Sequence, residues 1–237
     1  MEEYKFLATS QSLESARIVT KLLDEVIRLP KSILDVGCGV GGWSMAYKER
    51  GIEKITMLDH PSNKKGNLLF QENEFHNIDF ETSVPPVYPA ELVICFEVLE
   101  HIHAHRCHAV IEYLTKCSDT ILFSAAIPGQ HGYKHVNENF SPYWEAVFAQ
   151  FGFKKYDIIR PLILFNDSIE YFIRQNAFLF VKGNGLLHTT DHKKFLPDDF
   201  ELINRKVLNR HKSPVDLIKM MPGSLKKTMK HRFGKKK

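Results

Sequence analysis

Two carboxylates and four imidazoles crowd into one short stretch of the sequence, FEVLEHIHAHRCH at residues 96–108. Glu97 and Glu100 stand three positions apart, and His101 follows directly. If a helical turn begins there, these three side chains share one face, because positions i, i+3 and i+4 are neighbours on a helix. Two carboxylates and an imidazole can hold a divalent cation, and an imidazole can also take up a proton near neutral pH. The other three histidines are expected on a solvated helix face.

A second polar stretch, AAIPGQHGYKHVNENF at residues 125–140, follows the next apolar run. The loops after neighbouring parallel strands emerge at the same edge of a sheet, so we expect the two stretches to converge. His135 is then a candidate to join the first cluster. The other polar side chains suit an acceptor rich in hydroxyl groups, and the candidate contacts are Gln130, His131, Asn137 and Glu138.

Alternating helical and extended patterns predict the elements that position these residues. Residues 12–28 have apolar side chains at helical spacing and are followed by Pro30. Short apolar runs with helical patterns between them predict a mostly parallel sheet covered on both faces. We expect strands at 32–37, 54–60, 91–97, 119–127, 154–161 and 176–183, and helices at 43–51, 107–117 and 141–153, the last with Ser141 as N-cap.

The segment ILDVGCGVGGWS at residues 33–44 predicts a strand, a glycine-rich turn and a helix. Glycines allow the backbone to turn tightly and to approach a ligand closely. Asp59 ends the next strand about twenty residues later, where a carboxylate can accept from a ribose diol. The glycine spacing alone is a weak signal, since dinucleotide-binding folds use a similar turn.

Four motifs in order, LDVGCGVGGWS, MLDHPS, HNIDFE and LVICFEVLEHIH, resemble the class I S-adenosylmethionine-dependent methyltransferases over roughly residues 12–183. The resemblance implies a Rossmann-like, mostly parallel seven-stranded sheet with helices on both faces and the final strand antiparallel. It places Asp59 on the ribose, Asp79 by the adenine amino group, and Ile78 or Phe80 against the ring. The full set of cofactor residues that it implies is Asp35, Gly37, Cys38, Gly39, Gly41, Asp59, His60, Asp79, Phe80 and Phe96.

The pattern E-x-x-E-H with a later histidine resembles two methyltransferase groups that bind a divalent metal: the small-RNA 2′-O-methyltransferases and the ubiquinone-pathway O-methyltransferases. That resemblance implies Mg²⁺ or Mn²⁺ on Glu97, Glu100, His101 and His135. The segment EVLEH also occurs in small-molecule methyltransferases without a metal, where the histidine lines the pocket or acts as a base. On either alternative, the candidate catalytic residues are Glu97, His101 and His135.

A histidine base or a metal suits a hydroxyl acceptor, which is a poor nucleophile at neutral pH. Residues 123–153 also resemble a methyltransferase branch associated with bacterial polysaccharide and glycan biosynthesis, so methylation of a sugar or polysaccharide hydroxyl is the leading hypothesis. An RNA ribose 2′-O-methyltransferase and a non-catalytic S-adenosylmethionine-binding scaffold remain as alternatives.

The resemblance implies a methyltransferase domain at residues 1–185, whose first 30 residues cover the cofactor site, and the charge distribution predicts a basic C-terminal extension at 186–237. Residues 204–237 carry a charge of +11 within a chain of net charge +4, so the remaining 203 residues carry −7. The extension is therefore expected to be either a peripheral membrane contact or a disordered soluble tail, with contact to nucleic acid less favoured than both. The four cysteines form no CxxC pair, and the start lacks a signal peptide's apolar centre, so a cytoplasmic protein is expected.

Overall fold

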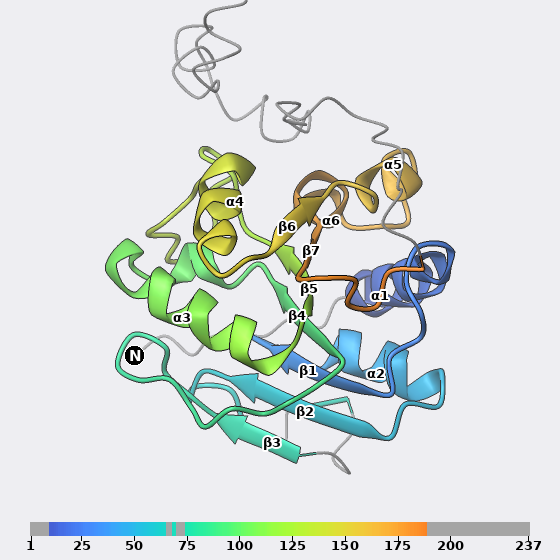
Figure 1. The fold of residues 1–237 in the computed structure, drawn as a ribbon, viewed down its shortest axis with the longest axis horizontal. Helices are drawn as coiled ribbons and strands as arrows, with labels where there is room; N and C mark the ends of the chain where they lie inside the picture. The colour runs from blue at the N-terminus through green and yellow to red at the C-terminus, as the bar shows by residue number, and fades with distance from the viewer. Residues whose placement is uncertain (1–9, 65–67, 70–73, 189–237) are drawn as a thin grey trace, which may run out of the picture.

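The computed structural model describes residues 10–64, 68–69 and 74–188, and in this part of the chain seven strands form a single sheet (Figure 1). The strand order is β3-β2-β1-β4-β5-β7-β6, and only β7 runs antiparallel to its neighbours. The predicted fold class is confirmed. The strands are β1 (Ser32–Val36), β2 (Lys54–Asp59), β3 (Glu74–Asn77), β4 (Leu92–Phe96), β5 (Thr120–Ser124), β6 (Lys154–Tyr156) and β7 (Phe178–Val181).

Helices cover both faces of the sheet. On one face, α1 (Ser10–Leu22) packs against α2 (Gly42–Glu49), and the 3₁₀ turn η1 (Leu23–Glu25) follows α1. The short helices α5 (Arg160–Ile163) and α6 (Tyr171–Asn176) lie on the same face. On the other face lie α3 (Ala104–Cys117) and α4 (Ser141–Ala149). A further 3₁₀ turn, η3 (Leu99–His101), connects β4 to α3.

Two apolar cores result from the alternation of side chains along the strands. Ile33 and Ile94 face the α1–α2 side, while their neighbours Leu34 and Val93 face α3 and α4. Every residue of β1, β4 and β5 is buried, as expected for strands covered on both faces. Trp144 is buried in the second core beside Phe123.

The sequence prediction differs from the structure at three short elements. The edge strand β3 was not predicted, because its four residues are largely polar and only half-buried or exposed. The strand expected at 154–161 ends at Tyr156, and helix α5 begins four residues later. Ser141 is the first residue of α4, whose N-cap is Phe140, so the prediction of Ser141 as N-cap was wrong.

The strands β1, β2, β4 and β5 are parallel, so their carboxyl ends lie at one edge of the sheet. Backbone hydrogen bonds hold the loops together there. The Gly37 amide donates to the Leu58 carbonyl, and the Glu97 amide donates to the Ser124 carbonyl. Three segments therefore start from this edge: the glycine turn, the stretch with Glu97, Glu100 and His101, and the loop after β5.

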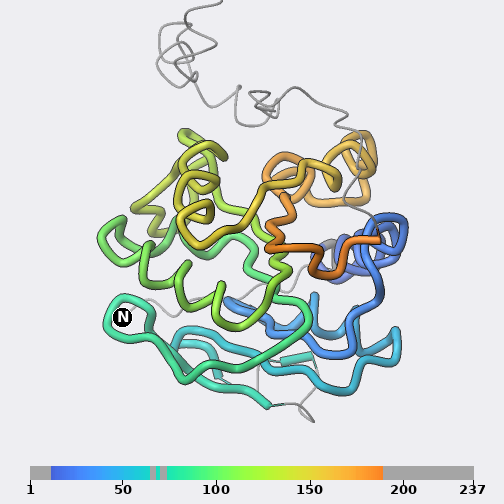
Figure 2. Tube along the Cα trace, in the orientation of Figure 1, coloured from blue at the N-terminus to red at the C-terminus, as the bar shows by residue number. Residues whose placement is uncertain are grey.

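The end of the described chain returns to the start of the domain (Figure 2). Ile27 and Leu187 form an antiparallel bridge, and the His188 amide donates to the Val26 carbonyl. The basic extension beyond residue 188 lies outside the described residues, as do residues 1–9. Among the described residues, no helix is long and apolar enough to cross a membrane.

Candidate active site

The glycine turn after β1 has the open backbone that a ligand needs. Gly37, Gly39 and Gly41 all have positive φ, at 71°, 57° and 84°. A Cβ added at Gly37 would lie 2.2 Å from Cγ2 of Val98, so this glycine permits close packing of the turn against the segment after β4. At Gly39, by contrast, an added Cβ would meet no atom within 4 Å. Gly37 is therefore required by packing, and Gly39 borders open space.

Asp35 lies behind the turn. It is 2% exposed, and its Oδ2 accepts a hydrogen bond from the Ser44 hydroxyl at 2.6 Å. Burial raises the pKa of Asp35 to about 7, with the nearby Asp59 adding to the shift and the Ser44 hydrogen bond opposing it. Asp35 thus ties β1 to the first turn of α2 and has little surface left for direct contact with a ligand.

Asp59, at the end of β2, faces the same turn. Its Oδ2 accepts from the Gly39 amide at 2.6 Å and from Nδ2 of Asn63 at 3.2 Å, and its Oδ1 accepts from the His60 amide at 2.6 Å. Burial raises the pKa of Asp59, and these three hydrogen bonds oppose the shift. The Cys38 thiol is buried 3.8 Å from Oδ2, and burial raises the pKa of that thiol. These contacts hold the Asp59 carboxylate at the glycine turn.

Three other predicted cofactor residues lie in different surroundings. Phe96 is buried with its ring edge-to-face with Trp43, at 4.6 Å between centroids. Phe80 is buried in the second core near Tyr113, at 5.9 Å between ring centroids. Asp79 is half-buried. The roles of all three residues in cofactor binding remain predictions.

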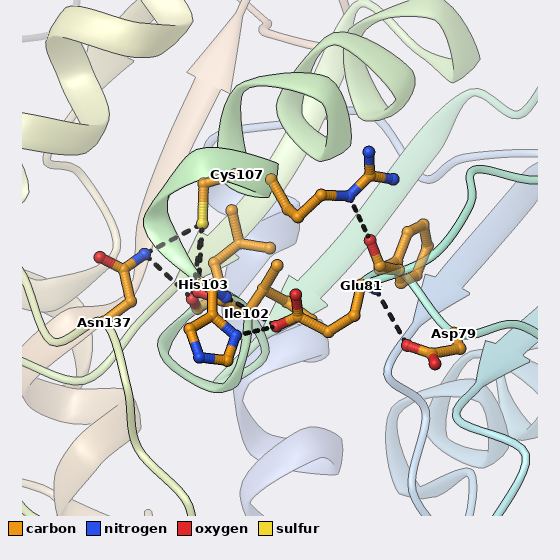
Figure 3. Close-up of polar contacts among 9 residues, drawn as sticks. Asp79, Glu81, Ile102, His103, Cys107 and Asn137 are labelled. Carbon is orange, nitrogen blue, oxygen red and sulfur yellow. Dashed lines mark hydrogen bonds and ion pairs between the residues drawn. The ribbon is translucent and has the colours of Figure 1, made fainter.

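The loop that carries Asp79 is joined to the start of α3 (Figure 3). Oδ1 of Asp79 accepts from the Glu81 amide at 2.9 Å. The Glu81 carboxylate accepts from the His103 amide at 2.7 Å and interacts with His103 Nδ1 at 2.9 Å. Arg106 adds a hydrogen bond from Nε to the Phe80 carbonyl at 3.1 Å. The predicted adenine loop is therefore attached to the helix that follows the carboxylate–histidine stretch.

Glu100, His101 and His135 form the cluster that the sequence predicted across two loops. One ligand atom from each of the three residues lies within 4.8 Å of the others. The rings of His101 and His135 are edge-to-face, with centroids 4.8 Å apart. Backbone bonds fix the meeting of the loops, since the amides of Val136 and Asn137 both donate to the Glu100 carbonyl.

Glu100 is the fully buried carboxylate of this cluster. It is 0% exposed, and neither of its carboxylate oxygens has a hydrogen-bond partner among the described residues. Burial and the neighbouring Glu97 raise the pKa of Glu100 well above its usual value. A buried anion of this kind is costly unless a cation or a proton compensates it.

The two histidines are suited to the role of metal ligands. Burial, together with the proximity of His135, lowers the pKa of His101 to about 4, so this imidazole is neutral at physiological pH. Nδ1 of His135 lies 2.8 Å from the Glu138 carboxylate, an arrangement that leaves Nε2 for a ligand. A neutral imidazole with so low a pKa is a weak base but a competent ligand. The donor set of carboxylate and two imidazoles therefore fits a divalent cation.

Glu97, the fourth predicted ligand, lies beside this cluster and interacts with Glu100 and His135, and its role as a ligand remains a prediction. Its φ is +53°, and its carboxylate accepts from Nε2 of Gln130 at 2.7 Å and from Nδ2 of Asn176 at 3.2 Å. Oε1 of Gln130 accepts from both Asn176 and Gln175, so two buried amides bind the carboxylate and a third, Gln175, holds Gln130. Asn176 lies at the end of α6, 79 residues from Glu97 in sequence, and no local motif signals its role.

The loop after β5 is organised by its own polar side chains. The Glu138 carboxylate accepts from the amides of Gly129 and His131, both at 2.7 Å. Nδ2 of Asn137 donates to the sulfur of Cys107 at 2.9 Å (Figure 3). Of the four predicted acceptor contacts, only His131 is exposed, while Gln130 and Asn137 are buried and Glu138 is half-buried. Contact of these residues with an acceptor remains a prediction.

Comparisons with known proteins agree with this fold. The family model described as "Methyltransferase domain" matches residues 8–118. A search of curated proteins gave no match. Magnesium protoporphyrin IX methyltransferase from Synechocystis PCC 6803 is similar in its structures with bound SAH and with bound SAM. The two have 17% and 16% identity and TM-scores of 0.55 and 0.50; each covers 73% of this chain, and 84% and 80% of the other.

The methyltransferase domain of bacterial CtHen1-C is similar as well. It has 14% identity and a TM-score of 0.52, and the match covers 73% of this chain and all of that domain. At these identities the solved structures establish the fold, and the family model adds the methyltransferase domain. This chain therefore matches a methyltransferase domain over residues 8–118 and has the fold of a methyltransferase solved with bound SAM and with bound SAH.

Proposed function

We propose that this methyltransferase transfers the methyl group of S-adenosylmethionine to a hydroxyl group of a sugar or a polysaccharide. The observation that carries the proposal is the Glu100–His101–His135 cluster at the edge where the glycine turn lies. A carbon or amine acceptor has less need of such a group of side chains than a hydroxyl acceptor has. A hydroxyl needs help in losing its proton, and a histidine base or a bound cation can supply that help.

The chemistry is an in-line displacement. The acceptor oxygen forms a bond to the methyl carbon, the carbon–sulfur bond breaks, and its electron pair returns to sulfur, which becomes a neutral thioether. The hydroxyl proton must leave. The protein therefore has to align two reactants and manage one proton, and it needs no nucleophile of its own.

Glu100, His101 and His135 would hold a divalent cation at this site, and Glu138 would orient His135. Such an ion supplies a Lewis acid that binds an acceptor hydroxyl and lowers its pKa. Glu97, fixed by Gln130 and Asn176, would present a carboxylate beside the cluster. Acceptors with two adjacent hydroxyl groups suit this arrangement, and sugars supply them.

The test is a screen for transfer of a labelled methyl group from S-adenosylmethionine to sugar nucleotides, isolated glycans and short RNAs, with Mg²⁺ or Mn²⁺ and with chelator. Incorporation into a sugar or glycan, at a base-stable ether position, supports the proposal. Incorporation only into nitrogen or carbon acceptors contradicts it. If calorimetry shows that the protein does not bind S-adenosylmethionine, the non-catalytic scaffold alternative replaces the enzyme.

The cluster also favours a second candidate, the ribose 2′-hydroxyl of an RNA, because a ribose end presents the same pair of adjacent hydroxyls. The E-x-x-E-H resemblance and the basic extension point in the same direction, whereas the −7 charge of the remaining chain disfavours nucleic acid. Labelled transfer to RNA 3′ ends that is abolished by periodate oxidation of the terminal diol would select this candidate.

A further inference from the structure

Asn63 is a buried amide that no motif singled out. It is 0% exposed and lies in the turn that follows β2. Its Nδ2 donates to the Gly39 carbonyl at 2.5 Å and to Oδ2 of Asp59 at 3.2 Å. The Gly39 amide donates to the same oxygen at 2.6 Å. One side chain therefore bridges the glycine turn and the carboxylate at the end of β2.

The position of Asn63 is itself fixed by backbone contacts. Its amide donates to the His60 carbonyl at 2.8 Å, which closes a tight turn. Nδ2 of Asn77, the last residue of β3, donates to the Asn63 carbonyl at 2.7 Å and to the His60 carbonyl at 3.1 Å. The bridge is thus held from the neighbouring strand, and it does not depend on the ligand.

The bridge determines which atom of Asp59 can take a further hydrogen bond. A carboxylate oxygen accepts about two hydrogen bonds. Oδ2 already accepts from Gly39, from Asn63 and from the Cys38 thiol, whereas among the described residues Oδ1 accepts only from the His60 amide. One lone pair of Oδ1 therefore remains for a hydroxyl donor.

We propose that Asn63 is a positioning residue of the cofactor site: its amide holds Asp59 against the glycine turn, so that Oδ1 is presented to a ribose hydroxyl of S-adenosylmethionine. The inference rests on the proposed cofactor role of Asp59. Asn63 does not touch the cofactor in this arrangement. It acts through the Asp59 carboxylate, and this effect on cofactor binding can be measured separately from a loss of folding.

The experiment is a double-mutant cycle on binding of S-adenosylhomocysteine, measured by calorimetry on the full chain. Loss of one hydrogen bond to a charged group predicts that Asn63→Ala raises Kd by roughly 10- to 100-fold. In an Asp59→Asn background the same substitution should change Kd by less than about threefold, because the group through which it acts is gone. Lys64→Ala, next to Asn63 in sequence but exposed, is the matched control and should leave Kd unchanged.

Equal effects of Asn63→Ala in the two backgrounds would overturn the inference, as would unchanged binding by a folded Asn63→Ala variant. Wild-type protein that does not bind S-adenosylhomocysteine would instead refute the proposed function. If the variant does not fold, a crystal structure of the wild-type complex decides. A ribose hydroxyl at Oδ1 with Asn63 still bonded to Oδ2 supports the inference, and a hydroxyl that displaces Asn63 from Oδ2 refutes it.

Discussion

Gly132→Ala should disturb the Glu100–His101–His135 cluster while leaving the fold intact. A Cβ at position 132 would lie 2.1 Å from Nε2, 2.4 Å from Cε1 and 2.7 Å from Cδ2 of His135. The imidazole must then retreat by at least about 1.4 Å to reach an ordinary contact of about 3.5 Å. That movement exceeds the tolerance of about 0.5 Å within which a functional constellation works.

The substitution should not destabilise the protein, because the atoms displaced belong to a side chain that can rotate. Gly132 does not have a positive φ, so alanine is compatible with its backbone. Replacing glycine by alanine at such a position stabilises a protein by about 0.4–1 kcal/mol, because it reduces the conformational entropy of the unfolded chain. Loss of the His135–Glu138 contact at 2.8 Å, which is partly screened by solvent, offsets part of that gain.

The assay is binding of Mn²⁺ by calorimetry or electron paramagnetic resonance, with the melting temperature measured in parallel. Gly132→Ala should weaken Mn²⁺ binding by about 10- to 100-fold, as loss of an orienting contact does elsewhere. His135→Ala should weaken it at least as much. Lys134→Ala is the matched control, since this exposed side chain lies in the same loop outside the cluster.

Unchanged Mn²⁺ binding by folded Gly132→Ala would refute the assignment of His135 as a ligand. Absence of Mn²⁺ binding by the wild-type protein would refute the metal site as a whole. In that case the cluster would act through its imidazoles alone, and turnover would survive exhaustive chelation.

Four further outcomes are expected. Chelation with EDTA should lower turnover at least tenfold and added Mn²⁺ should restore it; full activity in chelator would exclude the metal. Since burial raises the pKa of Asp35 from 3.8 to about 7, the folded state keeps a proton there that the unfolded state releases, and stability falls as pH rises from about 4 to about 7. In urea unfolding, the stability of Asp35→Asn relative to wild type should therefore rise by roughly 4 kcal/mol between about pH 4 and about pH 7. Parallel plots of stability against pH for the two proteins would contradict this. Gly37→Ala should abolish binding of S-adenosylhomocysteine, because its Cβ would lie 2.2 Å from a side-chain methyl group. Gly51→Ala, also at positive φ but with nothing within 4 Å of its Cβ, should bind normally. Equal binding by the two variants would refute the packing argument. Asn176→Leu removes a donor to Glu97 and should destabilise the protein by about 1–3 kcal/mol in denaturant unfolding, and an unchanged midpoint would show that the amide cluster contributes nothing to stability.

The cofactor edge was predictable because its signals are local. Apolar runs that end in glycine or in an acid specify a buried strand and the turn that follows it, and the structure has β1, the turn and α2 where the sequence placed them. The three histidines after His101 lie on an exposed face, as their spacing indicated. Edge strand β3 and helices α5 and α6 were not predicted, because these elements are short and weakly patterned and depend on tertiary contacts.

What the sequence by itself determined is the alternation of strands and helices and the grouping of Glu100 with His101, since both follow from spacing along a few residues. Only the tertiary structure decided that Glu97 is surrounded by amides from Gln130 and Asn176, and that Asn63 bridges the glycine turn to Asp59. These partners lie far apart in the chain or in an irregular turn. Their hydrogen bonds exist only after the sheet has brought its loops to one edge, and spacing cannot encode that convergence.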